Sequence, residues 1–350
     1  MGWDWNRIRV ACALAGNLGA VGVKLDEANP IAIRASNASH FLELGEIGLA
    51  GDFALKATAL AAVANLPDSV ISNERNQVEV SGNGFRFGIA KLPPLVGFPN
   101  TDLRPVGLYE REFLRGVESV QHASGGPVDS ITKGIRIVPW KGTQVAVCQD
   151  GRRWACAKVG AGIPWEGTMN AETIGLLKKL WSEDEEIEIA VSPNAVSFRG
   201  ESWKLRAALL QGEYQDCLTL AQGFADQCQG GFLVDWAQFR EHISRAKLFA
   251  KNEESERLAV TVAIGPEGYT VESSNTDGRY AGTGETEGTG VAGQWEWNPD
   301  FALAWLNQAE SERVRVGFSG PGKAIVLSDF WLNLSGFFGM ISPLVKRGEK

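Results

Sequence analysis

The sequence predicts an α+β protein that repeats one domain three times, with two helices packed on antiparallel sheets in each copy. Segments that alternate with period two around a turn containing Gly, Pro or Asn predict β-hairpins, and they recur at 21–47, 134–159 and 258–285. Each hairpin is followed by a second unit that opens on an amphipathic helix and continues into two strands. These second units begin at Phe53, Met169 and Asn298. Recurrence of this kind sets the architecture of a chain before any single motif does.

The elements follow one order in all three copies. Each copy begins with a helix whose apolar residues recur at i, i+3, i+4 and i+7, predicted at 5–14, 110–121 and 235–249. After the hairpin, the second helix is predicted at 53–68, 169–184 and 298–312. The closing strands are predicted at 78–92, 187–209 and 314–338.

The length of the chain agrees with this division. Single hydrophobic cores stop growing near ~250 residues, so 350 residues predict more than one domain. We expect three domains of ~110 to 120 residues each, at 1–105, 106–228 and 229–350. A hydrophobic content of 44% with 22% charged residues is typical of a soluble globular protein and argues against disorder.

The N-terminus admits two interpretations. Arg7 and Arg9 precede the run VACALAGNLGAVGV, which resembles the apolar part of a secretory signal. The alternative is an amphipathic helix over Trp5–Leu14 followed by a strand over Val21–Leu25. We favour the helix, because cleavage would remove an element that the repeat requires. No other stretch approaches the ~20 apolar residues of a membrane span, so we expect no membrane association.

Cysteine and histidine usage predicts a cytoplasmic protein without a metal or other cofactor. The five cysteines are an odd number with no CxxC spacing, and the three histidines are scattered. Cys148 and Cys156 bracket a turn and could in principle form a disulfide. We favour the simpler interpretation that each is a small apolar strand residue.

Positive charge is concentrated on the predicted helices, although the net charge of the chain is −8. The residues concerned are Arg7, Arg9, Lys56, Arg111, Arg115, Lys178, Lys179, Arg240, Arg245 and Lys247. One interpretation is that these are ordinary solvated helix faces. The other is that the helices of the repeats point toward a common axis and form a positive lining inside a negative exterior. That layout would hold a polyanion within a ring.

Motifs for catalysis are missing or lack their structural context. GTGVAG at Gly288–Gly293 satisfies G-x-G-x-x-G, but the dinucleotide fingerprint needs a strand before it and a helix after it. Here QWEWNPD follows, which predicts a strand and a turn. The acidic run SEDEEIE at Ser182–Glu188 lies between a helix and a strand, where we expect solvated carboxylates. No GxSxG, HExxH or P-loop occurs, so we predict that the protein is not an enzyme.

Several segments carry a resemblance to a known family. Gly51–Asn100 contains a helix, a Leu-Pro-Asp turn, the strand SGNGFRFGI, then Leu-Pro and Phe-Pro-Asn. AVCQDGRRWACAKV and LLQGEYQDCLTL come later, followed by DWAQFREHISRAKLFAKNEE and FFGMISPLV. In this order they resemble the bacterial DNA polymerase III beta subunit, the sliding clamp family, over nearly the whole chain. The resemblance implies two subunits joined head to tail in a closed ring around duplex DNA, with the helices lining the hole.

The resemblance also implies partner sites. It suggests a homodimer interface that includes Leu248 and Phe249, and a groove for short peptide motifs of DNA polymerase and the clamp loader. By position, the groove residues are Thr132, Gly151, Arg153, Trp154, Gln215, Leu220, Met340, Ser342, Pro343 and Leu344. The chain departs from the family at Arg152, Trp154, Gln215 and Thr219 and in the charged KRGEK ending. We therefore expect the groove to prefer motifs unlike the usual glutamine-leucine-phenylalanine type.

Two functions of different class fit these observations. The first is a processivity clamp that encircles duplex DNA without regard to its sequence. The second is a clamp-shaped interaction module that binds or titrates clamp partners without loading on DNA. The basic helices favour the first. The shortened segment after the first helix, Gly16–Gly19, and the absence of tyrosines before Gly134 favour the second.

Overall fold

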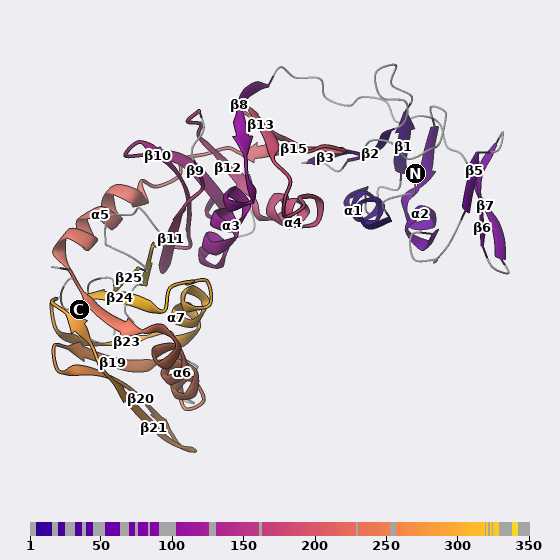
Figure 1. The fold of residues 1–350 in the computed structure, drawn as a ribbon. Coiled ribbons are helices and arrows are strands. Elements are labelled where there is room, and N and C mark those ends of the chain that lie inside the picture. The colour runs from indigo at the N-terminus through magenta and orange to yellow at the C-terminus, as the bar shows by residue number, and fades with distance from the viewer. Residues whose placement is uncertain are drawn as a thin grey trace. The chain divides into compact units, whose positions relative to one another are not determined.

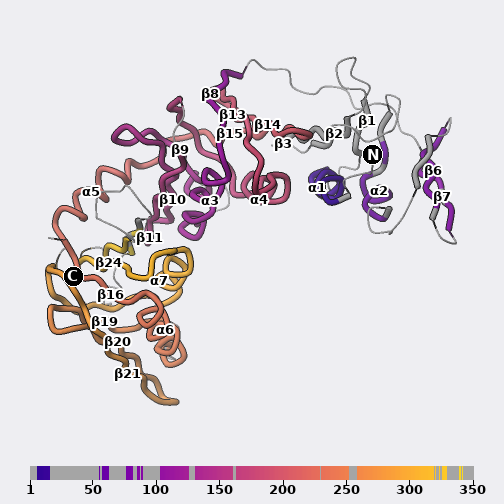
Figure 2. Tube along the Cα trace, viewed as in Figure 1, coloured from indigo at the N-terminus to yellow at the C-terminus, as the bar shows by residue number. Residues whose placement is uncertain are grey.

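The chain folds into two compact units, each assembled from separated stretches of sequence. The computed structural model describes residues 5–15, 20–24, 32–36, 40–44, 53–63, 70–73, 76–82, 85–90, 103–125, 131–160, 163–228, 230–252, 257–318, 320, 323, 325–328 and 338–341. Unit 1 comprises Met1–Leu114 and Gly160–Gln211, and unit 2 comprises Arg115–Val159 and Gly212–Lys350. The division falls inside helix α3 (Arg111–Val120). Figures 1 and 2 trace the elements.

Unit 1 is built on a long antiparallel sheet with the strand order β8-β13-β14-β15-β3-β2-β1-β4. Strands β15 and β3 join segments far apart in sequence, from Trp203 opposite Leu44 to Ala207 opposite His40. Strand β12 pairs with the end of β15, and β5-β6-β7 form a second sheet. The strands are β1 (Ala20–Lys24), β2 (Ala32–Ser36), β3 (His40–Leu44), β4 (Phe53–Lys56), β5 (Val70–Asn73), β6 (Gln77–Gly82), β7 (Phe85–Ala90), β8 (Arg104–Tyr109), β12 (Gly167–Asn170), β13 (Ile187–Ser192), β14 (Ala195–Arg199) and β15 (Trp203–Leu210).

The helices of unit 1 are α1 (Trp5–Ala15), α2 (Ala57–Val63) and α4 (Ala171–Leu180). Helix α1 contacts both α2 and α4. Its apolar face is buried, with Ile8 and Ala11 fully inaccessible, as expected for a helix that packs on a core. Phe113, at the start of α3, is also buried, and its ring centroid lies 6.2 Å from that of Trp181 and 6.4 Å from that of Phe198.

Unit 2 has a comparable long sheet, with the order β9-β10-β11-β26-β25-β24-β16-β22. A second sheet has the order β21-β20-β19-β23, and β17 pairs with β18. The strands are β9 (Gly134–Trp140), β10 (Thr143–Gln149), β11 (Arg153–Lys158), β16 (Phe232–Asp235), β17 (Lys251–Asn252), β18 (Arg257–Leu258), β19 (Val260–Gly265), β20 (Gly268–Asn275), β21 (Gly278–Gly284), β22 (Glu287–Gly288), β23 (Gly293–Trp297), β24 (Arg313–Phe318), β25 (Ile325–Ser328) and β26 (Phe338–Ile341).

The helices of unit 2 begin at side-chain caps that the sequence supplies. They are α5 (Cys217–Gln227), α6 (Trp236–Lys247) and α7 (Pro299–Leu306), besides the larger part of α3 and the short 3-10 helices η2 (Gln121–Ala123) and η3 (Ile131–Lys133). Asp216, Asp235 and Asn298 each accept a hydrogen bond from a backbone N–H of the first turn of α5, α6 and α7, respectively. Such caps satisfy N–H groups that have no partner within the helix. Helix α6 lies beside α7 and packs on β20 and β21 (Figure 1).

The predicted fold class is confirmed, and helices α1, α3 and α6 form within two residues of their expected bounds. The helices predicted at 169–184 and 298–312 are shorter than expected, because α4 ends at Leu180 and α7 ends at Leu306. Two further local predictions are wrong. Phe53–Lys56 is strand β4, and the helix predicted there begins only at Ala57. Helix α5 was not predicted. The sequence contained two signals for it, namely Asp216 at the N-cap and apolar residues at the spacing of one helix face. The division into three domains stays a prediction.

None of the helices in the described ranges is both long enough and apolar enough to cross a membrane. All five cysteines are buried free thiols, so Cys148 and Cys156 are not joined. Burial raises the pKa of the Cys12, Cys148, Cys217 and Cys228 thiols to about 12. These side chains act as small apolar residues.

Candidate nucleic-acid interface and partner groove

Seven of the predicted cationic residues are exposed on helices of the two units. We name them the exposed helix cations: Arg9 on α1, Arg115 on α3, Lys178 and Lys179 on α4, and Arg240, Arg245 and Lys247 on α6. In unit 1, Arg9 and the two lysines of α4 lie on helices that contact each other. Lys56 ends strand β4, and its side chain lies outside the described residues.

The exposed helix cations of α6 have polar neighbours. Arg240 donates from Nε to Asn307 Oδ1 at 2.6 Å, and Arg245 pairs with Glu241 one turn earlier. The Nζ of Lys247 lies 2.6 Å from a carboxylate oxygen of Asp300. Ion pairs at this degree of exposure contribute about 0–1 kcal/mol each. A phosphate can therefore compete for these cations at little cost.

Arg7 and Arg111 differ from the others, because both are largely buried at the C-terminal end of α4. Their side chains are 18% and 14% exposed. Arg111 donates to the carbonyl of Trp181, and Arg7 donates to that of Leu180 at 3.4 Å and to the hydroxyl of Ser202. Cations are stabilised at a helix C-terminus, where carbonyl groups lack partners. We infer that these two arginines brace unit 1.

Glu185 is the carboxylate at the centre of this brace. Its side chain is 11% exposed, with Oε2 3.9 Å from the guanidinium of Arg7. It accepts hydrogen bonds from Trp203 Nε1 at 3.0 Å and from the backbone N–H groups of Ser182 and Glu201 at 3.1 and 2.8 Å. The prediction that the acidic run is solvated is therefore wrong for Glu185 and right for Glu183, which is 65% exposed.

In unit 2, Trp154 and Met340 lie opposite each other on the paired strands β11 and β26. Trp154 is 4% exposed and belongs to a core cluster in which α5 covers β10 and β11. The other buried members are Val145, Val147, Cys156, Cys217, Leu218, Ala221, Ala225, Cys228 and Val326. The indole therefore fills space between α5 and the sheet. On the outer side of α5, Leu220 is 50% exposed.

The turn between β10 and β11 is held by Asp150. Its carboxylate accepts hydrogen bonds from the backbone N–H groups of Arg152 and Arg153 and from Nε of Arg153, all at 2.9 Å. Gly151 has a φ of +81°, which favours glycine. The Arg153 guanidinium lies 4.6 Å from the centroid of the Phe301 ring on α7. Successive strand residues point to opposite faces, so Arg153 and Trp154 serve different faces of the sheet.

The remaining groove residues are placed as follows. The hydroxyl of Thr132 donates to the carbonyl of Gly125 at 2.8 Å, and Gln215 is exposed just before the N-cap of α5. The side chain of Met340 and all of Ser342, Pro343 and Leu344 lie outside the described residues. The structure therefore brings Trp154, Leu220 and the backbone of Met340 to the α5 side of unit 2, and it directs Arg153 to α7.

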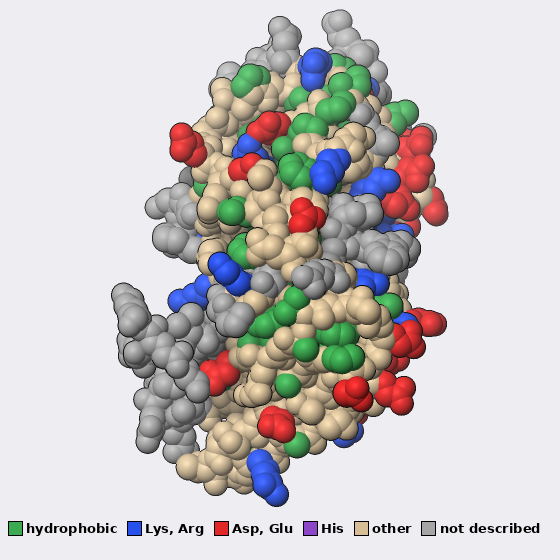
Figure 3. Space-filling model, turned by 90° about the vertical axis from the view of Figure 1, so that its left-hand side faces the viewer, with side chains coloured by type: hydrophobic (Ala, Val, Ile, Leu, Met, Phe, Trp, Pro, Cys, Tyr) green, Lys and Arg blue, Asp and Glu red, His purple; other side chains and the backbone are tan. Residues whose placement is uncertain are grey.

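Figure 3 shows apolar side chains lying between charged ones on one face of the molecule.

Solved structures of known proteins match nearly the whole chain. A sliding clamp, DNA polymerase III subunit beta, from Pseudomonas aeruginosa matches with a TM-score of 0.84, covering 98% of this chain and 97% of that one at 16% identity. The beta subunit from Streptococcus pyogenes matches with a TM-score of 0.80, covering 97% of each chain at 16% identity. The chain has the fold of the bacterial beta sliding clamps.

The sequence comparisons show how far the chain has diverged within this sliding clamp fold. The beta sliding clamp of Lactococcus lactis is 27% identical over 183 residues, which is 50% of this chain and 46% of that protein. The chain thus matches about half the length of this curated relative. No family model matches. The resemblance of the sequence to the beta sliding clamps is confirmed, and the low identities show that the chain is a divergent relative of them.

Sequence reasoning missed the polar groups that hold these sites in place. Lys141, in the β9–β10 turn, donates from Nζ to Gln222 on α5 at 2.8 Å. The Arg136 guanidinium lies 5.5 Å from the centroid of the Tyr214 ring, and Tyr214 donates to the carbonyl of Val147 at 3.4 Å. These contacts join residues far apart in sequence, so no local pattern indicated them.

Proposed function

We propose that the chain is a DNA sliding clamp, in which two copies close head to tail around duplex DNA and tether replication proteins. The proposal rests on the clamp fold of nearly the whole chain combined with its distribution of charge. Helices α1, α3, α4 and α6 expose cations, although the net charge of the chain is −8. Solvated cations attract phosphates without reading base sequence. A clamp needs no bond chemistry, in keeping with the expectation that the protein is not an enzyme.

The mechanism is topological. Sequence-independent phosphate contacts have dissociation constants of roughly 10⁻⁴ to 10⁻⁶ M at physiological salt, weak enough to permit sliding. A closed ring is retained because dissociation requires an interface to open. A polymerase bound to the ring re-engages its template at an effective concentration of order millimolar for a short tether. The exposed helix cations would supply the phosphate contacts, and Arg7 and Arg111 would keep α1, α3 and α4 in place.

For ring closure we propose the C-terminal end of α6. Leu248 is 74% exposed, and Phe249 packs against the tip of the β20–β21 hairpin at Gly278. Burying one large apolar side chain is worth ~1.5 to 3 kcal/mol, so a second copy of the chain that covered Leu248 would gain stability. A head-to-tail ring of two copies uses such an interface twice.

For partner proteins we propose the α5 side of unit 2. Trp154 fills the space between α5 and the sheet, and Leu220 is an exposed apolar side chain on the outer side of α5. Lys141, Arg152 and Gln215 are exposed in the same unit. We expect a peptide motif of polymerase or loader with an apolar anchor for Leu220 and acidic flanking residues.

Retention on circular DNA tests the proposed function. The protein is incubated with nicked circular plasmid, a bacterial clamp loader and ATP, and is then separated from free protein by gel filtration. The proposal predicts co-elution with the circle and release when a restriction enzyme linearises it. Equal retention on circular and linear DNA would contradict a threaded ring. Binding to the loader without retention would favour the interaction module that titrates clamp partners.

The two lysines of α4 give a more local prediction. We expect Lys178→Gln with Lys179→Gln to reduce the slope of log affinity for duplex DNA against log salt by ~1.8, because each phosphate contact contributes ~0.9. Fluorescence anisotropy with a labelled duplex measures this slope. Lys204→Gln, which removes an exposed lysine from strand β15, is the matched control and should leave the slope unchanged. Equal slopes for all variants would remove α4 from the interface.

A further inference from the structure

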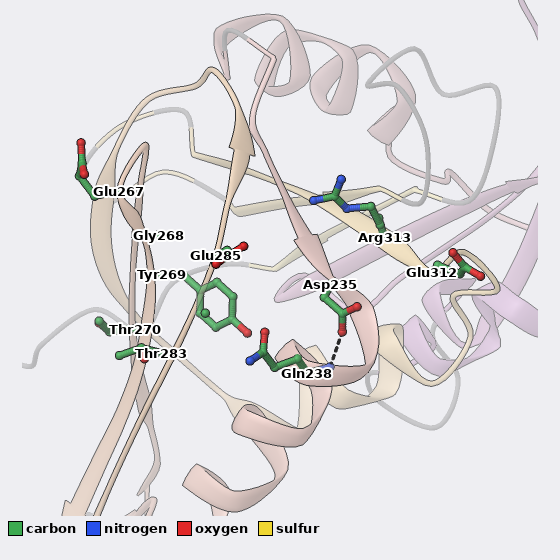
Figure 4. Close-up of a pocket in the computed structure, with 11 residues that line it drawn as sticks. Asp235, Gln238, Glu267, Gly268, Tyr269, Thr270, Thr283, Glu285, Glu312 and Arg313 are labelled. Carbon is green, nitrogen blue, oxygen red and sulfur yellow. Dashed lines mark hydrogen bonds between the residues drawn. The ribbon is translucent and has the colours of Figure 1, made fainter.

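A cavity of about 820 Å³ lies in unit 2 at the N-terminus of α6. Its walls come from two different sheets. One wall is the open end of the β20–β21 hairpin, and the other is formed by the last residue of β16 and the first residue of β24. The lining residues that bear on a ligand include Asp235, Gln238, Glu267, Tyr269, Glu285 and Arg313 (Figure 4). The cavity is at the opposite end of β21 from Gly278, which packs against Phe249. It therefore lies apart from the end of β21 nearest the proposed ring interface.

The charge of the cavity is negative. Four of its side chains are carboxylates, Asp235, Glu267, Glu285 and Glu312, and one is a guanidinium, Arg313. Arg313 already donates a hydrogen bond to Glu287. This hydrogen bond lowers the pKa of the Glu287 carboxyl. The unbalanced carboxylates favour a cationic ligand.

The carboxylates are spread along the cavity and do not meet at one point. Figure 4 shows Glu267 at one side, Glu285 and Asp235 nearer the middle, and Glu312 at the other side. Within the described residues, no group of three or more His, Cys, Asp or Glu side chains is arranged to hold a metal ion. A ligand complementary to this layout carries several positive charges spaced along its length.

Tyr269 is a second, independent indication of a ligand. The residue is 2% exposed, and its hydroxyl has no hydrogen-bond partner among the described residues. Figure 4 shows the hydroxyl directed toward Gln238 and Asp235. Leaving a buried polar group unsatisfied costs about 1–3 kcal/mol. Burial also raises the pKa of Tyr269, so the hydroxyl stays protonated and can both donate and accept.

The position of Tyr269 is fixed by its surroundings. Its ring centroid lies 5.1 Å from that of Phe239 and 6.0 Å from that of His242, with edge-to-face geometry. On β21, a Cβ atom added to Gly284 would overlap the Tyr269 ring. The Tyr269 hydroxyl is thus held at the cavity wall by the packing of the ring against α6. Glycine at position 284 leaves the space that the ring occupies.

We propose that this cavity binds an elongated organic cation, in which ammonium groups are spaced along a flexible aliphatic chain. Asp235, Glu267 and Glu285 would pair with the ammonium groups, and the Tyr269 hydroxyl would accept a hydrogen bond from one of them. The same chemistry is offered by a free polyamine and by lysine side chains of a protein segment. The inference goes beyond the proposed clamp function and does not depend on it.

Isothermal titration calorimetry of the full chain tests the proposal, with spermidine and tetralysine as separate probes. We expect Glu267→Gln with Glu285→Gln to weaken binding about tenfold, and Tyr269→Phe to weaken it about threefold. Glu272→Gln removes an exposed carboxylate of β20 outside the cavity and should change nothing. Tighter binding of spermidine assigns the cavity to free polyamines, and tighter binding of tetralysine assigns it to protein lysines.

The Tyr269→Phe variant also separates a ligand site from a structural defect. Removal of the unsatisfied hydroxyl should raise the thermal stability of the ligand-free protein in either case, so the affinities decide. If the hydroxyl serves no ligand, Tyr269→Phe leaves the affinity for both probes unchanged. That result, or equal affinity of the double glutamine variant and the wild type, would overturn the proposal. Titration with magnesium chloride is the comparison for simple charge attraction. Magnesium binding as strong as that of spermidine would also contradict it.

Discussion

Leu248→Asp is expected to convert the ring into monomers and to abolish retention on circular DNA. Leu248 is 74% exposed at the end of α6, and each proposed interface would lose the burial of one leucine, ~1.5 to 3 kcal/mol. A carboxylate buried there without a partner adds a further penalty. Because the ring uses the interface twice, the lost leucine burial amounts to about 3 to 6 kcal/mol. The carboxylate penalty brings the total loss to about 4 kcal/mol or more. That corresponds to about a 1,000-fold or greater rise in the dimer dissociation constant.

Sedimentation velocity at micromolar concentration measures the change, followed by the retention assay on nicked plasmid. Leu108→Asp is the matched control, because Leu108 is 63% exposed on strand β8 of unit 1 and is not among the residues proposed for the interface. It should remain dimeric and be retained on circles. A dimeric Leu248→Asp variant would place the ring interface elsewhere.

The sequence predicted the fold class and most helices, because these depend on local periodicity and capping. Helix α6, for example, begins after Asp235 and buries Phe239 and Ile243, as its spacing predicts. Lys56 was assigned to a helix because FALK is followed by a strong helical pattern. Pairing of β4 with β1 extends this segment instead, an effect of tertiary structure that local propensity does not contain.

The candidate site was less predictable, because it depends on contacts between distant residues. The sequence grouped Arg7 and Arg111 with the other cations, yet both carry hydrogen bonds and ion pairs at the end of α4. Trp154 and Arg153 are neighbours in a groove motif, but they serve opposite faces of the sheet. Charge and family position indicated which residues matter, and the contacts decided what each one does.

Glu185→Ala is expected to destabilise unit 1 by about 3–5 kcal/mol. The carboxylate is 11% exposed and is the acceptor for Trp203 Nε1 and two backbone N–H groups. Its removal leaves these three donors without their acceptor and takes away a carboxylate 3.9 Å from the Arg7 guanidinium. Breaking a buried pair from one side has a cost of this size. Urea unfolding combined with hydrogen exchange of the β15 backbone measures the effect within unit 1.

Glu186→Ala is the control for the loss of one carboxylate from the same acidic run. Glu186 is exposed, and surface substitutions of this kind change stability by about 0.5 kcal/mol or less. Equal effects of the two substitutions would show that Glu185 contributes only as a solvated charge. Unit 2 should keep its exchange protection in both variants, because the substitutions lie in unit 1.

A cryo-electron microscopy reconstruction of the protein loaded on duplex DNA with blocked ends would show whether the chain encircles DNA. We expect two copies in a closed ring with the duplex passing through it, and phosphates near Arg9, Arg115, Lys178 and Arg240. Leu248 of each copy should be buried against the other. Duplex bound on the outer surface, or an open single copy with these cations pointing away from DNA, would contradict it.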